Sequence, residues 1–222
     1  MGKVALGENM HSIIFDLDGT LWDTTLIVAE AWKKSIQENY DSDFDISDQM
    51  LKGLFGKPIT DIARILFPNE TNERCQELIQ GCCQLEHEML AAQAPEVYHG
   101  VREGLQQLKD AGHRMFIVSN CQQGYIELFV KVSNLGMFFE GILCAGDTGE
   151  SKGYNIKKII EDYQIENPLY VGDIDGDHQA SIEAKVPFVF AEYGFGDTKE
   201  PDYSIQQFSD LVSLMKKLNK MS

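Results

Sequence analysis

Two carboxylates, Asp16 and Asp18, stand one residue apart near the start of the chain. The four residues before them, 12–15, are rich in β-branched and aromatic side chains and contain no Gly or Pro, which predicts a short buried strand. On an extended backbone both carboxylates leave the same face of the strand, whereas Leu17 points to the other face. Such a pair repels itself unless a cation lies between the two groups or one of them carries a proton. The spacing therefore predicts a site at the end of this strand, where open α/β sheets bind their ligands.

Gly19 and Thr20 follow the two carboxylates. Gly permits a sharp turn, and the Thr hydroxyl is able to hydrogen-bond to a ligand or to nearby backbone. A plain polar turn is the alternative, because Asp and Gly commonly form turns. The pattern Asp-x-Asp-Gly is also half of a calcium-binding loop, so later segments have to decide between these interpretations.

Later segments also place polar side chains where a predicted strand ends or a helix begins, at Ser119, Asn120, Lys152 and Asp173. Because the carboxyl ends of parallel strands meet at one edge of a sheet, we expect these side chains to share a site with the first two carboxylates. Ser119 and the backbone amides around Asn120 suit a phosphate group, although a plain helix cap is the alternative for both residues. Lys152 opposes the dipole of the helix that it begins, which favours an anionic partner over the usual solvated position.

A second acidic cluster contains Asp173, Asp175 and Asp177. Their spacing matches the first ligands of an EF-hand, but that loop requires Gly at its sixth position and Glu at its twelfth, where this chain has His178 and Ala184. A calcium loop is therefore excluded. Carboxylates that follow a strand, opposite the first pair, instead offer the hard oxygen ligands that octahedral Mg²⁺ prefers.

The order of the predicted elements indicates an α/β fold. Residues 22–92 show a helical pattern without a strand, and from residue 95 strands and helices alternate, which predicts right-handed crossovers and a parallel sheet with helices on both faces. We expect a doubly wound, Rossmann-like core domain (residues 1–23 and 93–222) with a helical cap domain (residues 24–92) inserted after the first strand. The predicted strands are 12–15, 115–118, 142–145, 169–171 and 188–191; the predicted helices are one within 26–40, then 59–66, 72–90, 100–111, 124–134, 153–163, 178–185 and 208–218.

Composition limits the partners and the compartment. The chain has 222 residues, 43% hydrophobic, and a formal net charge of -16, which argues against non-specific binding to nucleic acid or to an anionic membrane. An anionic small molecule would need a local cation, supplied by a divalent metal or a buried Lys. Five cysteines without a Cys-x-x-Cys pair indicate free thiols, and no apolar run resembles a signal peptide or a membrane span, so we expect a cytoplasmic protein. The oligomeric state and the native status of residues 1–9 are left open.

These segments resemble the motifs of the haloacid dehalogenase superfamily in their expected order. The run Asp16-Leu17-Asp18-Gly19-Thr20-Leu21 resembles the first motif in its phosphatase form, Ser119 the second, Lys152 the third, and Gly172-Asp173 with Asp177 the fourth. The resemblance covers nearly the whole chain from residue 12, and the helical block corresponds to the cap that the phosphoglycolate phosphatase-like branch carries after its first motif. One departure is Gly153, because the third motif often continues Lys-Pro.

The resemblance implies a role for each motif residue. Asp16 would be the nucleophile that forms an aspartyl phosphate, and Asp18 the general acid and then the base. Mg²⁺ would be held by the Asp16 side chain, the Asp18 backbone carbonyl and Asp173, with Asp177 supporting directly or through water. Ser119 and Lys152 would bind the transferring phosphoryl group of a small phosphorylated metabolite, and the remaining substrate contacts would come from Thr20, Asn120 and Lys57, the last in a cap loop whose alternative is a plain surface turn.

Phosphatase activity on a small phosphomonoester, phosphoglycolate-like or a sugar phosphate, is the leading interpretation. A phosphomutase of the β-phosphoglucomutase type shares the cap and the motifs, but Thr20 favours a hydrolase. A dehalogenase would not need Asp18, and a phosphonate hydrolase would need a Schiff-base lysine in the cap, where the candidates are Lys33, Lys34, Lys52 and Lys57. A non-catalytic binding protein of the same fold is the remaining alternative, although the intact motif residues argue against it.

Overall fold

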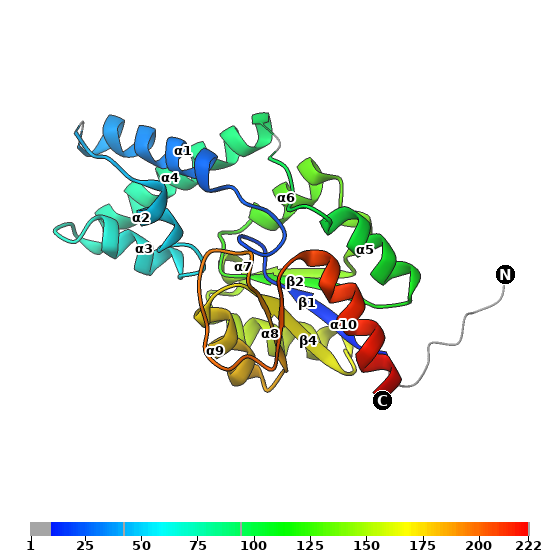
Figure 1. Ribbon diagram of the computed structural model, residues 1–222. Helices are drawn as coiled ribbons and strands as arrows, with labels where there is room; N and C mark the ends of the chain where they lie inside the picture. The colour runs from blue at the N-terminus through cyan, green and yellow to red at the C-terminus, as the bar shows by residue number, and fades with distance from the viewer. Residues whose placement is uncertain (1–9, 42, 94, 222) are drawn as a thin grey trace.

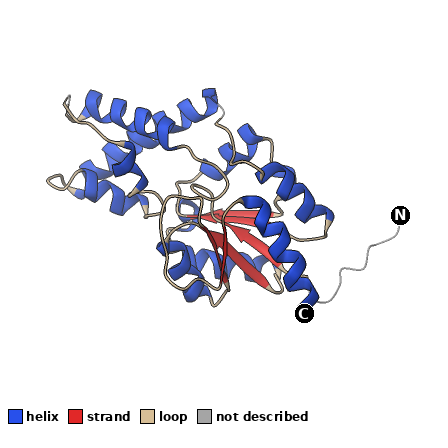
Figure 2. Ribbon diagram, in the orientation of Figure 1, coloured by secondary structure: helices blue, strands red, loops and turns tan. Residues whose placement is uncertain are grey.

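The strands form one parallel sheet at the centre of the molecule. The computed structural model describes residues 10–41, 43–93 and 95–221, so the question about residues 1–9 lies outside it. Six strands pair in the order β3-β2-β1-β4-β5-β6, and every pairing is parallel (Figure 2). Their bounds are β1 (Ser12–Phe15), β2 (Met115–Ser119), β3 (Gly141–Cys144), β4 (Pro168–Gly172), β5 (Phe188–Ala191) and β6 (Tyr203–Ile205).

Helices cover both faces of the sheet. Successive strand residues point to opposite sides, so each face carries apolar side chains that need to be buried. In β1, Ile13 and Phe15 pack into one apolar cluster, and Ile14 packs into the other. The first cluster includes side chains of α5 (Val101–Asp110), α6 (Tyr125–Ser133) and α10 (Phe208–Met221), and the second those of α8 (Lys152–Tyr163) and α9 (Asp175–Ala184). The predicted doubly wound α/β fold is confirmed.

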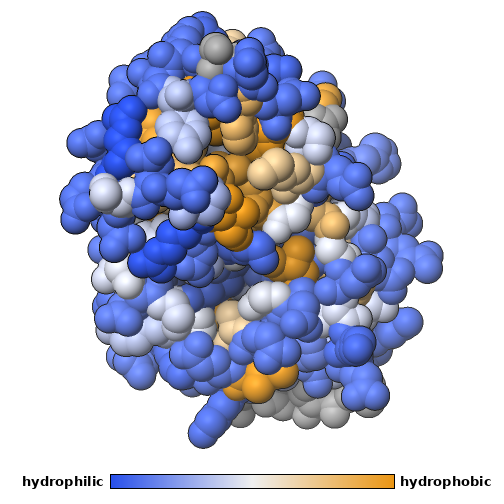
Figure 3. Space-filling view, turned by 90° about the vertical axis from the view of Figure 1, so that its left-hand side faces the viewer, coloured by the Kyte–Doolittle hydropathy of each residue, from blue (hydrophilic) through white to orange (hydrophobic). Residues whose placement is uncertain are grey.

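The helical block between β1 and α5 contains α1 (Thr25–Asn39), α2 (Asp48–Lys52), α3 (Ile59–Leu66) and α4 (Asn72–Gln93). These four helices lie together to one side of the sheet (Figure 1). The helix α4 packs along α1 and also contacts α3. Seen from the side of this block, apolar side chains gather near the middle of the face and hydrophilic ones cover most of the remaining surface (Figure 3). The division into a core of 1–23 plus 93–222 and a cap of 24–92 stays a prediction.

Several short elements differ from the sequence prediction, among them α2, which was not one of the predicted helices. The strand β6 was not predicted, because three residues after a Pro carry too little periodicity, and it gains its place by pairing with β5 at the edge of the sheet. Ala145, expected at the end of a strand, instead begins α7 (Ala145–Thr148), where the Asp147 carboxylate accepts a hydrogen bond from the Cys144 amide. No helix in the described part of the chain is long and apolar enough to cross a membrane.

Candidate active site

The strand order explains why the motif residues meet. The strands β2, β1 and β4 are neighbours in the sheet, and all three run in the same direction. Ser119 ends β2, Asp16 follows β1 directly, and Asp173 follows β4 directly. The carboxyl ends of these three strands therefore bring their side chains to one edge, as the sequence predicted.

Lys152 forms ion pairs with two of the motif carboxylates. Ser151 caps α8 by accepting a hydrogen bond from the Tyr154 amide, which places Lys152 at the first residue of the helix. The Nζ atom of Lys152 lies 2.9 Å from Oδ1 of Asp16 and 2.6 Å from Oδ1 of Asp177, and all three side chains are at most 3% exposed. Burial on its own lowers the pKa of Lys152, but the two carboxylates outweigh it and raise that pKa above its usual value. Lys152 is therefore a fixed positive charge beside Asp16.

Asp16, Asp173 and Asp177 form a compact cluster of buried carboxylates. One oxygen atom from each lies within 4.8 Å of the others. Burial, followed by the charge of Asp177, raises the pKa of Asp16 to about 6, although Lys152 opposes this change. Burial and the neighbouring carboxylates also raise the pKa of Asp173 well above its ordinary value. A single ammonium leaves this cluster short of positive charge, and a hard divalent cation fits such a donor set.

Hydrogen bonds from other segments hold the cluster in place. The Asp177 Oδ2 atom accepts from the backbone amides of Asp173 and Ile174, at 3.0 and 3.2 Å. Asp173 accepts from the Thr20 hydroxyl at 2.9 Å and from a backbone amide at 2.8 Å. Gly19 adopts a φ of +83°, and a Cβ atom there would lie 2.1 Å from Asp173 Oδ2, so this turn requires Gly. Asp173 is thereby oriented by the segments that follow β1 and β5, the two strands that pair with β4.

Asp18 has a different environment from Asp16. Its Oδ1 atom accepts hydrogen bonds from the Tyr125 hydroxyl at 2.9 Å and from the Thr24 hydroxyl at 3.0 Å. Burial and then the charge of Asp16 raise the pKa of Asp18 to about 7, and the two hydroxyl donors lower it only in part. A carboxyl group with this pKa is able both to donate and to accept a proton near neutral pH.

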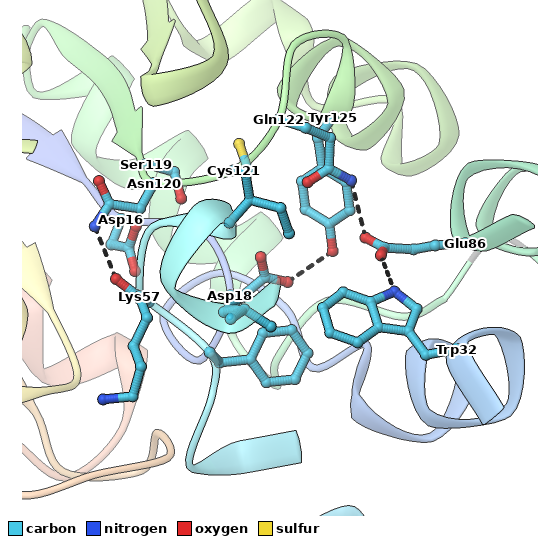
Figure 4. Close-up of a pocket in the computed structure, with 14 residues that line it drawn as sticks. Asp16, Asp18, Trp32, Lys57, Glu86, Ser119, Asn120, Cys121, Gln122 and Tyr125 are labelled. Atoms are coloured by element: carbon cyan, nitrogen blue, oxygen red, sulfur yellow. Dashed lines mark hydrogen bonds between the residues drawn. The ribbon is translucent and has the colours of Figure 1, made fainter. Parts of the chain in front are cut away.

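A pocket lies between the sheet edge and the helical block (Figure 4). Its core side includes Asp16, Asp18, Ser119 and Asn120, and its free volume is about 40 Å³. The Asn120 side-chain amide donates to the Gly56 carbonyl at 2.7 Å, which joins the end of β2 to the loop before α3.

Lys57 also lines this pocket, but its exposed side chain extends away from Asp18 (Figure 4). Thr20 is fully buried against Asp173 and does not line the pocket, so its predicted contact with substrate receives no support from this position. Lys152 does not line the pocket either, and its ammonium group donates to Asp16.

Several pocket residues were not predicted from the sequence, namely Trp32, Glu86, Gln122 and Tyr125, and neither was Thr24, which hydrogen-bonds to Asp18. Glu86 lies on α4 and accepts hydrogen bonds from the Trp32 indole at 2.5 Å and from the Gln122 amide at 3.2 Å. Trp32 and Tyr125 occupy positions in helical apolar patterns, where a core role is the default expectation. The one available signal was Glu86, an acidic residue in the apolar stripe of α4 between Cys83 and Leu90.

Comparisons with known proteins agree with this fold. The family described as haloacid dehalogenase-like hydrolase matches residues 13–191. Pyrophosphatase PpaX of Anoxybacillus flavithermus is 26% identical over 216 residues, which cover 93% of this chain and 97% of that protein. Among solved structures, a haloacid dehalogenase-like family hydrolase from Streptococcus pneumoniae has a TM-score of 0.80 at 18% identity and covers 93% of this chain and 98% of its own. A predicted phosphoglycolate phosphatase from Haemophilus somnus 129pt has a TM-score of 0.76 at 18% identity, with 94% and 99% covered.

The two solved structures share the fold, and the family match extends from the first strand to the fifth, across every motif position from Asp16 to Asp177. The chain belongs to the haloacid dehalogenase-like hydrolase family.

Proposed function

We propose that the protein is a magnesium-dependent phosphatase that hydrolyses a small phosphomonoester through an aspartyl phosphate on Asp16. The observation that carries this proposal is the pairing of two carboxyl groups in one pocket with different chemistry. Asp16 is held beside the ammonium group of Lys152, whereas Asp18 accepts from two hydroxyl groups and has a pKa of about 7. Two carboxyl groups with different environments are typical of a nucleophile next to a general acid.

In the first half-reaction, a carboxylate oxygen of Asp16 attacks the phosphorus atom and forms a P–O bond. The bond between phosphorus and the leaving-group oxygen breaks, and that oxygen takes the proton of Asp18. Ser119, at the end of β2, donates its hydroxyl to a phosphoryl oxygen, and the Lys152 ammonium keeps Asp16 oriented and offsets negative charge.

In the second half-reaction, a water molecule attacks the phosphorus atom of the aspartyl phosphate and Asp18 accepts its proton. The bond between phosphorus and the Asp16 oxygen breaks, which releases inorganic phosphate and restores the carboxylate. The Tyr125 and Thr24 hydroxyl groups hold Asp18 in the same position for both proton transfers.

Asp16, Asp173 and the backbone carbonyl of Asp18 are the proposed Mg²⁺ ligands. Asp177 already accepts from Lys152 and from two backbone amides, so we assign it a supporting role. When bound, Mg²⁺ supplies positive charge that offsets the charge on the transferring phosphoryl group.

The relatives support a phosphorylated substrate, because PpaX is named a pyrophosphatase and the Haemophilus protein a phosphoglycolate phosphatase. A cytoplasmic location is part of the proposal. It is supported by the five cysteines, all of which are free thiols.

The experiment is a measurement of phosphate release from a panel of phosphomonoesters with Mg²⁺, with a chelator, and in the Asp16→Asn variant. Asp175→Asn is the matched control. Asp175 lies between the cluster residues Asp173 and Asp177 in the sequence, but it is exposed and is not part of the carboxylate cluster. We expect metal-dependent release that Asp16→Asn abolishes and Asp175→Asn retains. A folded protein that releases phosphate from no ester would support the mutase or binding-protein alternatives instead.

A further inference from the structure

The pocket has two sides with different chemistry. Ser119 and Asn120 line the side nearest Asp16, where the phosphoryl group would bind. The opposite side is formed by the helical block and by Gln122 and Tyr125, and it would receive the leaving group. Glu86 lies on that side, with Asp18 between it and Lys57 (Figure 4).

Glu86 is a buried acid without a cationic partner. Its side chain is 3% exposed, and in the part of the chain that the structure describes it takes part in no ion pair. Burial raises the pKa of Glu86 to about 8, and a cationic group bound beside it would favour the charged form of this acid. When Glu86 is ionised, the two donors from Trp32 and Gln122 use one lone pair on each oxygen and each oxygen retains another; when it is protonated, one of these positions holds the proton. A donor on a ligand is therefore able to bind there.

The other walls of this side are apolar or aromatic: Trp32, Phe55, Ile59 and Ile62. Lys57 is the only Lys or Arg among the described residues that line the pocket, and its ammonium group points away from Asp18 and Glu86 (Figure 4). A carboxylate or a second phosphate on the leaving group would thus lose its hydration beside two acidic side chains, with no Lys or Arg side chain directed at it. An ammonium group would meet an acidic oxygen and aromatic rings, both of which attract cations.

We propose that Glu86 is a specificity-determining residue, and that the enzyme selects phosphomonoesters whose leaving group carries a hydroxyl or ammonium donor and no negative charge. This inference rests on the proposed phosphatase function. It separates the chain from the activities named for its relatives, since glycolate and phosphate are both anionic leaving groups.

The test uses three esters that differ only at the far end of a two-carbon leaving group. These are hydroxyethyl phosphate, phosphoethanolamine and phosphoglycolate, which end in a hydroxyl, an ammonium and a carboxylate. We expect kcat/KM for each of the first two to exceed that for phosphoglycolate by about tenfold or more, the usual effect of a hydrogen bond to a charged group. Calorimetry with the Asp16→Asn variant measures Kd for the same esters, so the ranking does not depend on turnover.

The variant Glu86→Gln removes the acid but keeps an acceptor for the Trp32 indole. It should lower kcat/KM for phosphoethanolamine by about tenfold, change hydroxyethyl phosphate little, and leave phosphoglycolate unchanged or improved. Glu88→Gln is the matched control, because Glu88 lies on the same helix but is exposed and outside the pocket. It should change none of the three values.

Preference of the wild-type protein for phosphoglycolate, by turnover or by Kd, would overturn the inference, and loss of that preference in Lys57→Ala would identify the cation responsible. Equal effects of Glu86→Gln and Glu88→Gln on all three esters would also overturn it. Hydrolysis of p-nitrophenyl phosphate by the wild-type protein distinguishes this failure from a failure of the proposed function. If Glu86→Gln does not fold, the wild-type ranking and the calorimetry decide alone.

Discussion

Replacing Lys152 with Met should destabilise the protein far more than the same replacement on the exposed face of the helix. Lys152 is the one ammonium group in contact with Asp16 and Asp177 among the described residues, and the three side chains are almost completely buried. Removing one partner of a buried ion pair leaves an uncompensated charge and costs about 3–5 kcal/mol. Lys157→Met is the matched control, because Lys157 pairs with Glu183 at 3.3 Å while both side chains are more than 40% exposed. An exposed pair of this kind contributes about 0–1 kcal/mol.

The assay is urea unfolding with a chelator present, so that metal binding does not contribute. With a slope of about 3 kcal/mol/M, Lys152→Met should lower the midpoint by about 1–2 M and Lys157→Met by about 0.3 M or less. Midpoints that fall equally in the two variants would refute the reasoning. Should Lys152→Met fail to fold, the double variant with Asp177→Asn provides the second measurement, since removing one of the two buried charges should restore part of the stability.

Three further predictions concern Glu86, Asp173 and Tyr125. Because the pKa of Glu86 is about 8 in the folded protein and near 4.5 when exposed, the folded state binds the extra proton between these values, and wild-type stability should fall as the pH rises from about 5 to 8. The Glu86→Gln variant lacks this dependence. In urea unfolding, its free energy of unfolding relative to wild type should therefore rise by up to a few kcal/mol over that pH window. A difference that stays constant with pH would contradict the raised pKa of Glu86. Mg²⁺ at 100 times its Kd should stabilise the wild-type protein by about 2.7 kcal/mol in thermal unfolding, and Asp173→Asn should remove most of that gain; an unchanged gain would mean that the metal binds elsewhere. Tyr125→Phe should lower kcat/KM about tenfold because Asp18 loses a donor, whereas Tyr154→Phe, at an exposed position, should not, and equal rates would place Tyr125 outside the proton-transfer step.

The part of the site that the motif residues form was predictable, because short-range sequence patterns determine it. Each motif residue stands next to a recognisable strand end or helix start, and the parallel topology then brings Asp16, Ser119 and Asp173 together without further information. The roles assigned to these residues stay predictions, although their positions agree with them. The fold was predictable for the same reason, since the alternation of strands and helices allows few topologies.

The side of the pocket around Glu86 was not predictable, because its residues come from separate helices. Trp32 and Glu86 are 54 positions apart, and Gln122 lies between β2 and α6. Glu86 lies in the apolar stripe of α4, and it becomes part of the pocket only because α1 packs against α4. A period of 3.6 residues identifies a buried face but not what it is buried against. The strand β6 escaped prediction for a related reason, since its pairing partner rather than its own sequence defines it.

The hydrogen bond between Asn120 and the Gly56 carbonyl has a kinetic consequence. It spans a pocket of about 40 Å³, whereas a small-molecule site is usually about 300–1,000 Å³, so we expect the loop before α3 to move when a phosphomonoester binds. A movement that breaks this bond would make the Asn120 amide available to a phosphoryl oxygen. Loop opening would then limit the turnover number wherever cleavage of the phosphate ester is fast, and we expect higher solvent viscosity to slow turnover in that case.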